Sequence, residues 1–284
     1  MRKKILVALG VLVLVAGTFA LALPTVLHKA GLHPEYNGVK VQLPPGKKAL
    51  VITTSHGVLA PPGETQGKPS GVMASEMTHP YYNFLDAGMQ VDVASIKGGK
   101  IPVDPQTLQY MIVTPDDKRF LEDPAFQAKV NNSLRIDDVD FTQYDIIFLA
   151  GGWGAAYDLG YSTVLAEKIS QAYYADTPVI GGVCHGVLGL INAKDRDGNA
   201  LIAGRRMTGV SDKQIKELGI EITPQHPETE LRKAGVIYES QSAFRDFFAT
   251  HVVVDDERRF VTGQNQNSGH ETAQKMMAII AGNE

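Results

Sequence analysis

Cys184 is the only cysteine among the 284 residues, and it lies in the stretch VIGGVCHGVL at residues 179–188. Gly182 and Gly186 stand two positions before and after it. This G-x-nucleophile-x-G spacing is typical of a tight, strained turn that lifts a nucleophile above a sheet and needs small neighbours. A helix beginning at such a turn would favour the thiolate through its dipole and stabilise an oxyanion with its free N–H groups. The pattern predicts a nucleophilic thiol; the alternative is a buried structural cysteine.

A nucleophilic thiol needs an acid or a base nearby, and the sequence offers two candidates. His185 follows Cys184 directly. Adjacent residues of a regular helix do not face each other, so contact between these two depends on the strained turn. Glu76 lies in MASEMTHPYYNF, on a predicted helix whose N-terminal end opens onto the same sheet edge. Its carboxyl is placed to share a proton with the thiol; the alternative is that it only favours the helix N-terminus.

The segments around these residues alternate between strand and helix patterns. Apolar, β-branched runs predict strands at residues 49–54, 90–95, 145–150 and 178–183. Apolar residues at helical spacing predict helices at residues 75–87, 161–175 and 186–193. Residues 251–264 predict two strands joined by a charged turn, and a closing helix follows with a capping box at Ser268 and Glu271.

This alternation predicts one α/β domain over residues 47–284. We expect a doubly wound, flavodoxin-like, mainly parallel sheet with helices on both faces. In such sheets ligands bind beyond the carboxyl ends of the strands, which is where Cys184 falls.

The N-terminus reads as a membrane anchor or a signal peptide over residues 1–24. Three basic residues precede an uncharged stretch at residues 5–23. As a helix this stretch is about 28 Å long, close to the ~30 Å hydrocarbon core of a bilayer. An uncleaved anchor gives a single-pass protein of the cell membrane, whereas cleavage near residues 20–22 gives a periplasmic or secreted one. In both cases the positively charged N-terminal end of the helix stays in the cytoplasm, so the domain lies outside it. Residues 25–46 are predicted to be a linker or an arm on the domain.

Composition and motifs argue against several other functions. The formal net charge is −4, and the basic residues beyond the N-terminus are scattered, so nucleic acid is not an expected partner. His56, His79 and His270 form no H-x-x-x-H or H-E-x-x-H pair, and we expect them at the surface or at helix ends rather than in a metal site. The glycines of GGKIPVDP fit neither a phosphate-binding loop nor a dinucleotide motif. No cofactor is expected.

Five stretches together resemble the ThiJ/PfpI superfamily, whose fold is that of class I glutamine amidotransferases. They are EMTHPYYNFLDAGMQVDVASIKGGKIPVDP, YDIIFLAGGWGAAYDL, VIGGVCHGVLGL, GRRMTGVSD and VTGQNQNSG, in the order found in the superfamily. The branch they resemble most contains heat-shock chaperones and glutathione-independent glyoxalases (glyoxalase III). The resemblance implies that Cys184 is the nucleophile, His185 its imidazole partner and Glu76 the carboxyl beside the thiol. It also implies backbone donors at Gly151 and Gly152, opposite the His185 N–H. It leaves open whether the protein forms a homodimer.

The chain departs from the superfamily pattern at three places. Trp153 stands where relatives carry a histidine at the pocket edge. Gln214 and Ile215 stand where relatives carry an acidic pair, so His185 lacks the acid that completes a triad unless Asp212 replaces it. Gln266 replaces a proline, a change expected to matter only for the turn.

The resemblance implies an enzyme that converts a small reactive carbonyl such as methylglyoxal to a 2-hydroxy acid without glutathione, a hydro-lyase of the glyoxalase III type. Cys184 would add to the aldehyde, and Glu76 or His185 would move a proton between the two carbons. Two alternatives stay open: a stress chaperone or redox sensor with an oxidisable Cys184, and a cysteine peptidase or amidase. The missing triad acid counts against the second.

Overall fold

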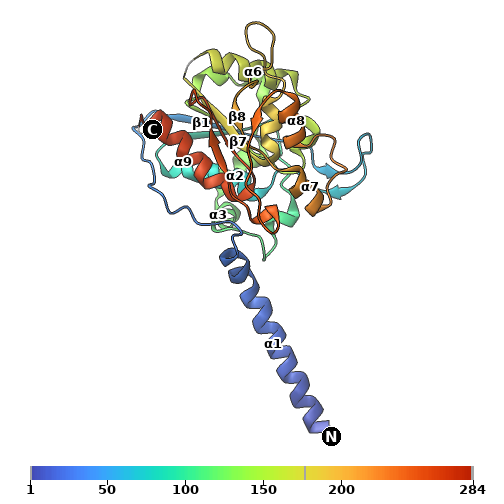
Figure 1. The fold of residues 1–284 in the computed structure, drawn as a ribbon. Helices are drawn as coiled ribbons and strands as arrows, with labels where there is room; N and C mark the ends of the chain where they lie inside the picture. Colours follow the sequence, from blue (N-terminus) through green and yellow to red (C-terminus); the bar gives the residue numbers. More distant parts are fainter. Residues whose placement is uncertain (1, 176, 283–284) are drawn as a thin grey trace.

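The computed structural model describes residues 2–175 and 177–282; Met1, Asp176, Asn283 and Glu284, and with them the outer ends of the predicted anchor and domain, lie outside the described residues. The described part contains a seven-stranded sheet in the order β10-β11-β7-β6-β1-β4-β5 (Figure 1). Its strands are β1 (Lys48–Thr53), β4 (Gln90–Ser95), β5 (Leu134–Arg135), β6 (Ile146–Leu149), β7 (Val179–Val183), β10 (Val252–Val254) and β11 (Phe260–Gly263). All neighbours run parallel except β10 and β11. Two small sheets pair β2 (Val58–Leu59) with β3 (Lys68–Pro69) and β8 (Arg206–Met207) with β9 (Ile237–Tyr238).

Helices cover both faces of the large sheet, so the chain has the predicted mainly parallel α/β architecture. One face carries α2 (Ala74–Asp86), α3 (Pro115–Glu122), α4 (Pro124–Asn131) and α9 (Gly269–Ile280). The other face carries α5 (Ala155–Asp158), α6 (Thr163–Tyr174), α8 (Pro227–Lys233) and the 3₁₀ helix η4 (Cys184–Leu190). Helix α7 (Asp212–Leu218) packs on α8 and on η5 (Asp246–Phe248). The remaining 3₁₀ helices are η1 (Pro105–Leu108), η2 (Ile136–Asp138), η3 (Phe141–Gln143) and η6 (Gln266–Ser268).

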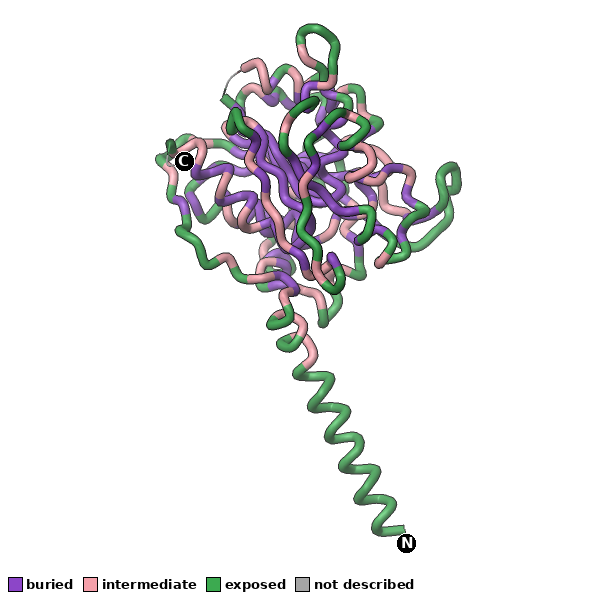
Figure 2. The backbone as a smooth tube through the Cα atoms, viewed as in Figure 1, coloured by how far each residue is buried: buried purple, intermediate pink, exposed green. Residues whose placement is uncertain are grey.

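The strands are apolar on both faces because each face packs against helices. In β1, Leu50 and Ile52 face the cluster that contains α6, whereas Val51 faces the cluster that contains α2 and α9. Figure 2 shows this buried centre beneath an exposed rim of loops. The carboxyl ends of the central strands are thereby held at one edge, where β7 leads directly into Cys184.

Two local predictions are wrong. The helix expected at residues 186–193 is the tighter η4, which begins at Cys184 itself. A Cβ at Gly186 would collide with the Leu149 carbonyl, so this segment lies unusually close to β6. The capping box at Ser268 is not formed, because the Ser268 hydroxyl is bound to the backbone of His251 instead.

The N-terminal segment is one long helix, α1 (Arg2–Lys29), that projects away from the domain (Figure 1). It is long and apolar enough to cross a membrane, and none of its residues is buried. It continues past the predicted end at residue 24, and an arm follows along the domain. Leu32 is buried, the His33 amide donates to Asn267 Oδ1 at 2.8 Å, and the Val41 amide donates to Gln274 Oε1 at 2.9 Å.

Candidate active site

Cys184 sits on a strained turn at the carboxyl end of β7. Its φ is 56°, in the left-handed region that a residue with a side chain rarely adopts. Gly182 and Gly186 both approach the Leu149 carbonyl so closely that a Cβ at either position would collide with it. The glycine pattern around the cysteine therefore reflects a real packing requirement, and the thiol is fixed at the sheet edge.

Glu76 meets the thiol from the first turn of α2. Its side chain is fully buried, and the absence of a Cβ at Gly151 leaves room for its carboxyl. Burial raises the pKa of Glu76 to about 8, against the opposing influence of the Cys184 thiol and the Gly151 and Gly152 amides. Burial and the neighbouring Glu76 carboxyl also raise the pKa of the Cys184 thiol. Two negative charges this close together repel each other. The pair therefore ionises by losing one proton, and the thiol and the carboxyl share the proton that remains.

The expected stabilisation of the thiolate by a helix dipole is therefore wrong. The segment after Cys184 is a short 3₁₀ helix, and burial outweighs what its amides contribute. The backbone amides of His185 and Gly152 do lie against the sulfur and oppose the rise in its pKa. These are two donors of the kind that an oxyanion needs.

His185 contacts the thiol but has no acid behind it. Its Nδ1 lies 3.3 Å from Cys184 Sγ, and its Nε2 is buried without a hydrogen bond to any described residue. Burial, and then the charge of His226, lower the pKa of His185 to about 3. The imidazole is therefore neutral at physiological pH.

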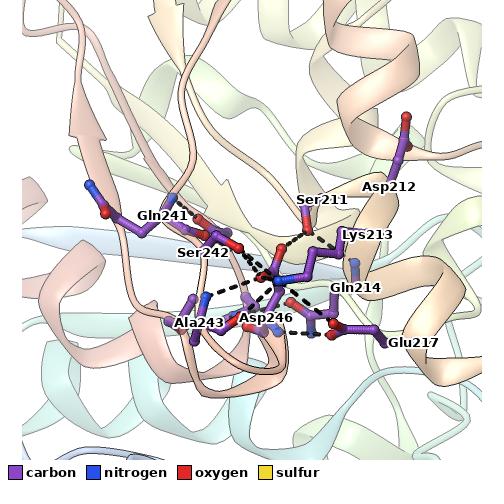
Figure 3. A network of polar contacts seen from close by, with 12 residues as sticks. Ser211, Asp212, Lys213, Gln214, Glu217, Gln241, Ser242, Ala243 and Asp246 are labelled. Carbon is purple, nitrogen blue, oxygen red and sulfur yellow. Dashed lines mark hydrogen bonds and ion pairs between the residues drawn. The ribbon is translucent and has the colours of Figure 1, made fainter.

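An amide network occupies the position where relatives carry the triad acid. Gln214 is buried, and its Oε1 accepts a hydrogen bond from Asn265 Nδ2 at 3.0 Å. Ile215 is buried in the core. Asp212 is exposed and accepts a hydrogen bond from Thr229 Oγ1 at 2.8 Å; Figure 3 shows it pointing away from the network below it. It does not line the thiol pocket, so it does not replace the missing acid.

A cavity of about 250 Å³ lies over the thiol. Cys184, His185 and Glu76 line it together with Trp153, as the sequence suggested for the pocket edge. Further lining residues were not predicted, and they lie in or beside η1, α7 and η5, just before α2, or in the segment after η1, among them Met73, Asp104, Thr107, Ile112, Leu218 and Phe247. A cavity this small suits a ligand of a few heavy atoms rather than a peptide chain.

Gln266 belongs to this pocket, so the expectation that it matters only for the turn is wrong. Its Nε2 donates to the Phe247 carbonyl at 2.8 Å, and its Oε1 lies 3.4 Å from Gln214 Nε2. A proline would offer neither contact. The substitution thus ties the pocket wall at Phe247 to the residue that takes the place of the acid.

The wall at Phe247 is held from its other side by a charged cluster. Figure 3 shows Ser211, Lys213 and Ser242 converging on the carboxylate of Asp246, the residue before Phe247. The Lys213 Nζ and Ser211 Oγ donate to this carboxylate at 2.8 Å and 2.7 Å. Because Asp246 is buried and multiply bonded, the loop that carries Phe247 is anchored to the start of α7.

The DJ-1/PfpI family model matches residues 69–279, the stretch that contains the strained cysteine, the buried glutamate and the strands that hold them. The chain belongs to the DJ-1/PfpI family. Two curated relatives are glyoxalases. "Glyoxalase 3" of Candida albicans is 26% identical over 227 residues, covering 76% of this chain and 92% of the relative. "Glutathione-independent glyoxalase HSP31" of Saccharomyces cerevisiae is 27% identical over 240 residues, covering 80% of this chain and 95% of the relative.

Solved structures of this DJ-1/PfpI fold agree over most of the chain. The Rapid Encystment Protein of 24 kDa from Francisella tularensis matches with a TM-score of 0.74 and 33% identity, covering 82% of this chain and 99% of that one. The glyoxalase III of Candida albicans matches with a TM-score of 0.71 and 26% identity, covering 82% and 96%. The described DJ-1/PfpI domain is therefore similar in sequence and fold to glyoxalases, while its helix α1 lies outside the matched family region.

Proposed function

We propose that this protein converts a small 2-oxoaldehyde such as methylglyoxal to the 2-hydroxy acid, by a route that depends on Cys184 and not on glutathione. The observation that carries the proposal is the buried pair of Cys184 and Glu76 at the base of a cavity of about 250 Å³. The glyoxalase names of the curated relatives support the substrate class.

The first step is addition of the thiol to the aldehyde carbon. In the reactive state of the pair the sulfur is a thiolate and the Glu76 carboxyl holds the shared proton. The thiolate forms a C–S bond with the aldehyde carbon, and the electrons of the C=O bond move to its oxygen. That oxyanion lies near the amides of Gly152 and His185 and takes the proton from Glu76, giving a hemithioacetal.

The second step moves hydrogen between the two carbons. The Glu76 carboxylate removes the proton from the former aldehyde carbon, the electron pair forms a C=C bond to the adjacent carbonyl carbon, and the electrons of that C=O bond move to its oxygen, giving an enediolate. Glu76 returns the proton to the adjacent carbon, and the proton on the first oxygen is transferred to the second oxygen as the first C=O bond forms, which leaves a 2-hydroxyacyl thioester on Cys184. Water then cleaves the thioester, releasing the 2-hydroxy acid and restoring the thiol. The net reaction adds one water and needs no oxidant or metal.

The same geometry disfavours peptide hydrolysis. A cysteine peptidase uses an imidazole oriented by an acid or amide to protonate a leaving amine. Here the buried His185 has a pKa of about 3, and its Nε2 meets no hydrogen-bonding partner among the described residues. A proton shuttle through Glu76 does not require that imidazole to become charged.

Helix α1 is proposed to be a membrane-spanning anchor that holds the domain outside the cytoplasm. Its length, its apolar composition and the basic residues before it support this placement. Alkaline carbonate extraction of membranes from cells that express the full chain should leave the protein in the pellet. Release of a shortened, soluble chain would favour a cleaved signal peptide instead.

Turnover without glutathione tests the proposed reaction. The purified full-length protein in detergent is mixed with methylglyoxal, and aldehyde loss and lactate formation are followed for the wild type and for Cys184→Ala. We expect lactate in proportion to aldehyde consumed by the wild type and none above background from the variant. A folded wild-type protein that forms no lactate, or a variant that keeps turning over, would refute the proposal.

A further inference from the structure

A second group of polar side chains lies away from the thiol pocket, where three helices meet. His79 is on α2, Asp116 is in the first turn of α3, and His270 is in the first turn of α9. One nitrogen or carboxylate oxygen from each lies within 4.8 Å of those of the other two. None of the three lines the thiol pocket. No metal-binding motif marks these residues in the sequence because they come from three separate helices.

The imidazoles of this group are short of hydrogen bonds. His79 is almost fully buried, and its Nδ1 has no partner among the residues that the structure describes. Its Nε2 is 3.3 Å from Thr114 Oγ1, an atom that already accepts a hydrogen bond from the Asp117 amide. His270 Nε2 and Asp116 Oδ2 are 3.9 Å apart, too far for a hydrogen bond. Buried polar groups normally have hydrogen-bond partners, so the lack of partners in this cluster indicates a binding site for a ligand.

The arm after α1 adds a further histidine beside the cluster. His33 is buried, its ring centroid is 5.8 Å from that of His79, and both of its ring nitrogens lack partners within the described residues. A cavity of about 300 Å³ is lined by all four residues and opens at the surface between the arm and the domain. Its rim carries the acidic Glu35 and Asp86 as well as the basic Lys40.

We propose that His79, His270 and Asp116 bind one divalent transition-metal ion of the zinc type. Two imidazoles and one carboxylate form a ligand set that suits Zn²⁺ with one position left for water or a further ligand. His33, whose ring lies beside that of His79, offers a further nitrogen for this position. His79 is buried and His270 half-buried, surroundings that favour the uncharged imidazole that binds a metal ion.

Binding requires a small closure of the cluster. An ion bound at about 2 Å holds adjacent ligand atoms about 3.3 Å apart, so the present spacing must shrink by about 1.5 Å at most. The His79 and His270 rings are stacked, with centroids 3.9 Å apart and planes at 22°. The His270 side chain is 27% exposed, which leaves room for its ring to tilt until both nitrogens point at the ion. The Nε2 of His270 faces Asp116, and the Nδ1 lies 2.8 Å from Asn83 Nδ2. An ion bound at Nε2 requires the ring proton on Nδ1, so the Asn83 amide must turn its oxygen towards Nδ1 when the ion binds.

The test measures metal binding to untagged, full-length protein that has been treated with a chelator and transferred to metal-free detergent buffer. Zn²⁺ is titrated by calorimetry, and Co²⁺ is added separately to record its visible absorption. We expect one ion per chain and a Co²⁺ spectrum with nitrogen and oxygen ligands. His270→Asn and Asp116→Asn, both at partly exposed positions, should each weaken binding by about tenfold or more, and His33→Ala should weaken it less. His251→Gln, outside the cluster, is the matched control.

Circular dichroism confirms that each variant is folded, and lactate formation is measured in parallel. Because none of these residues touches the thiol pocket, loss of metal binding should leave any turnover of methylglyoxal unchanged. No binding by the wild type would overturn the proposal. So would wild-type affinity in both His270→Asn and Asp116→Asn, or equal loss of affinity in the His251→Gln control.

Discussion

Replacing Glu76 by glutamine should stabilise the folded protein while lowering turnover by about a hundredfold or more. Burial raises the pKa of Glu76 to about 8 from the ordinary value of 4.5. The folded protein therefore binds this proton more tightly than the unfolded chain, so stability falls as pH rises from 4.5 towards 8. Each unit of pH in that window costs about 1.4 kcal/mol. The cost reaches about 1 kcal/mol at pH 5, 3 kcal/mol at pH 7 and 4 kcal/mol at pH 8.

Glutamine has the shape of the protonated acid and cannot ionise, so Glu76→Gln removes this cost. Because about 1 kcal/mol shifts the Tm of a domain this size by about 2–4 °C, the variant should melt about 6–12 °C higher than the wild type at pH 7. The gain should be much smaller at pH 5. Turnover should fall by about 10²–10⁴-fold, because the shared proton is lost.

Thermal unfolding of the full chain at pH 5, 7 and 8, followed by near-UV circular dichroism, measures the effect. Glu167→Gln, at an exposed position on α6, is the matched control and should show no pH-dependent gain. A Glu76→Gln variant that melts below the wild type at pH 7 would refute the reasoning. A gain of the same size at every pH would do so as well.

Three further substitutions test the surroundings of Cys184 and Glu76 and the attachment of the N-terminal arm. His185→Gln should lower kcat/KM by about 10–100-fold without moving the pH profile, since His185, with a pKa of about 3, is neutral throughout; a displaced inflection would contradict this. Gln214→Glu should lower Tm, relative to the wild type, more at pH 8 than at pH 5, because it buries an ionisable acid. An equal change in Tm at both pH values would show that the site tolerates the charge. Asn267→Ala should speed proteolytic cleavage of the arm, because Asn267 Nδ2 donates to the carbonyls of Gly31 at 2.9 Å and Phe247 at 3.1 Å; an unchanged cleavage rate would mean that other contacts hold the arm.

The sequence was informative where contacts are local. The glycines around Cys184 sit within two residues of it, so their spacing predicted the strained turn that its φ of 56° shows. The alternation of apolar strands with helices is a local pattern as well, and it predicted the parallel sheet because parallel strands need helical crossovers that cover both faces. Even here a local rule failed: the helix dipole was expected to favour the thiolate, but burial among distant segments governs the pKa of the sulfur.

Most of the residues that the fold brings together were not predictable from the sequence; Glu76 and Trp153, which the resemblance placed at the thiol site, are exceptions. Asp104 and Phe247 line the thiol pocket from segments far apart in the chain, and no periodic pattern marks them. Gln266 looked like a turn residue because its contacts with Phe247 and Gln214 depend on how three segments pack. The meeting of His79 with His270 is likewise a product of α2 packing on α9.

A covalent intermediate on the cysteine is the most direct sign of the proposed chemistry. The full-length protein is mixed with methylglyoxal, quenched in acid within one turnover, digested and examined by mass spectrometry. We expect a lactoyl group on the peptide that contains Cys184, removed by hydroxylamine and absent from Glu76→Gln, in which the proton transfer between the carbons cannot occur. Lactate formed while Cys184 remains unmodified at every quench time, or lactate formed by Cys184→Ala, would contradict it.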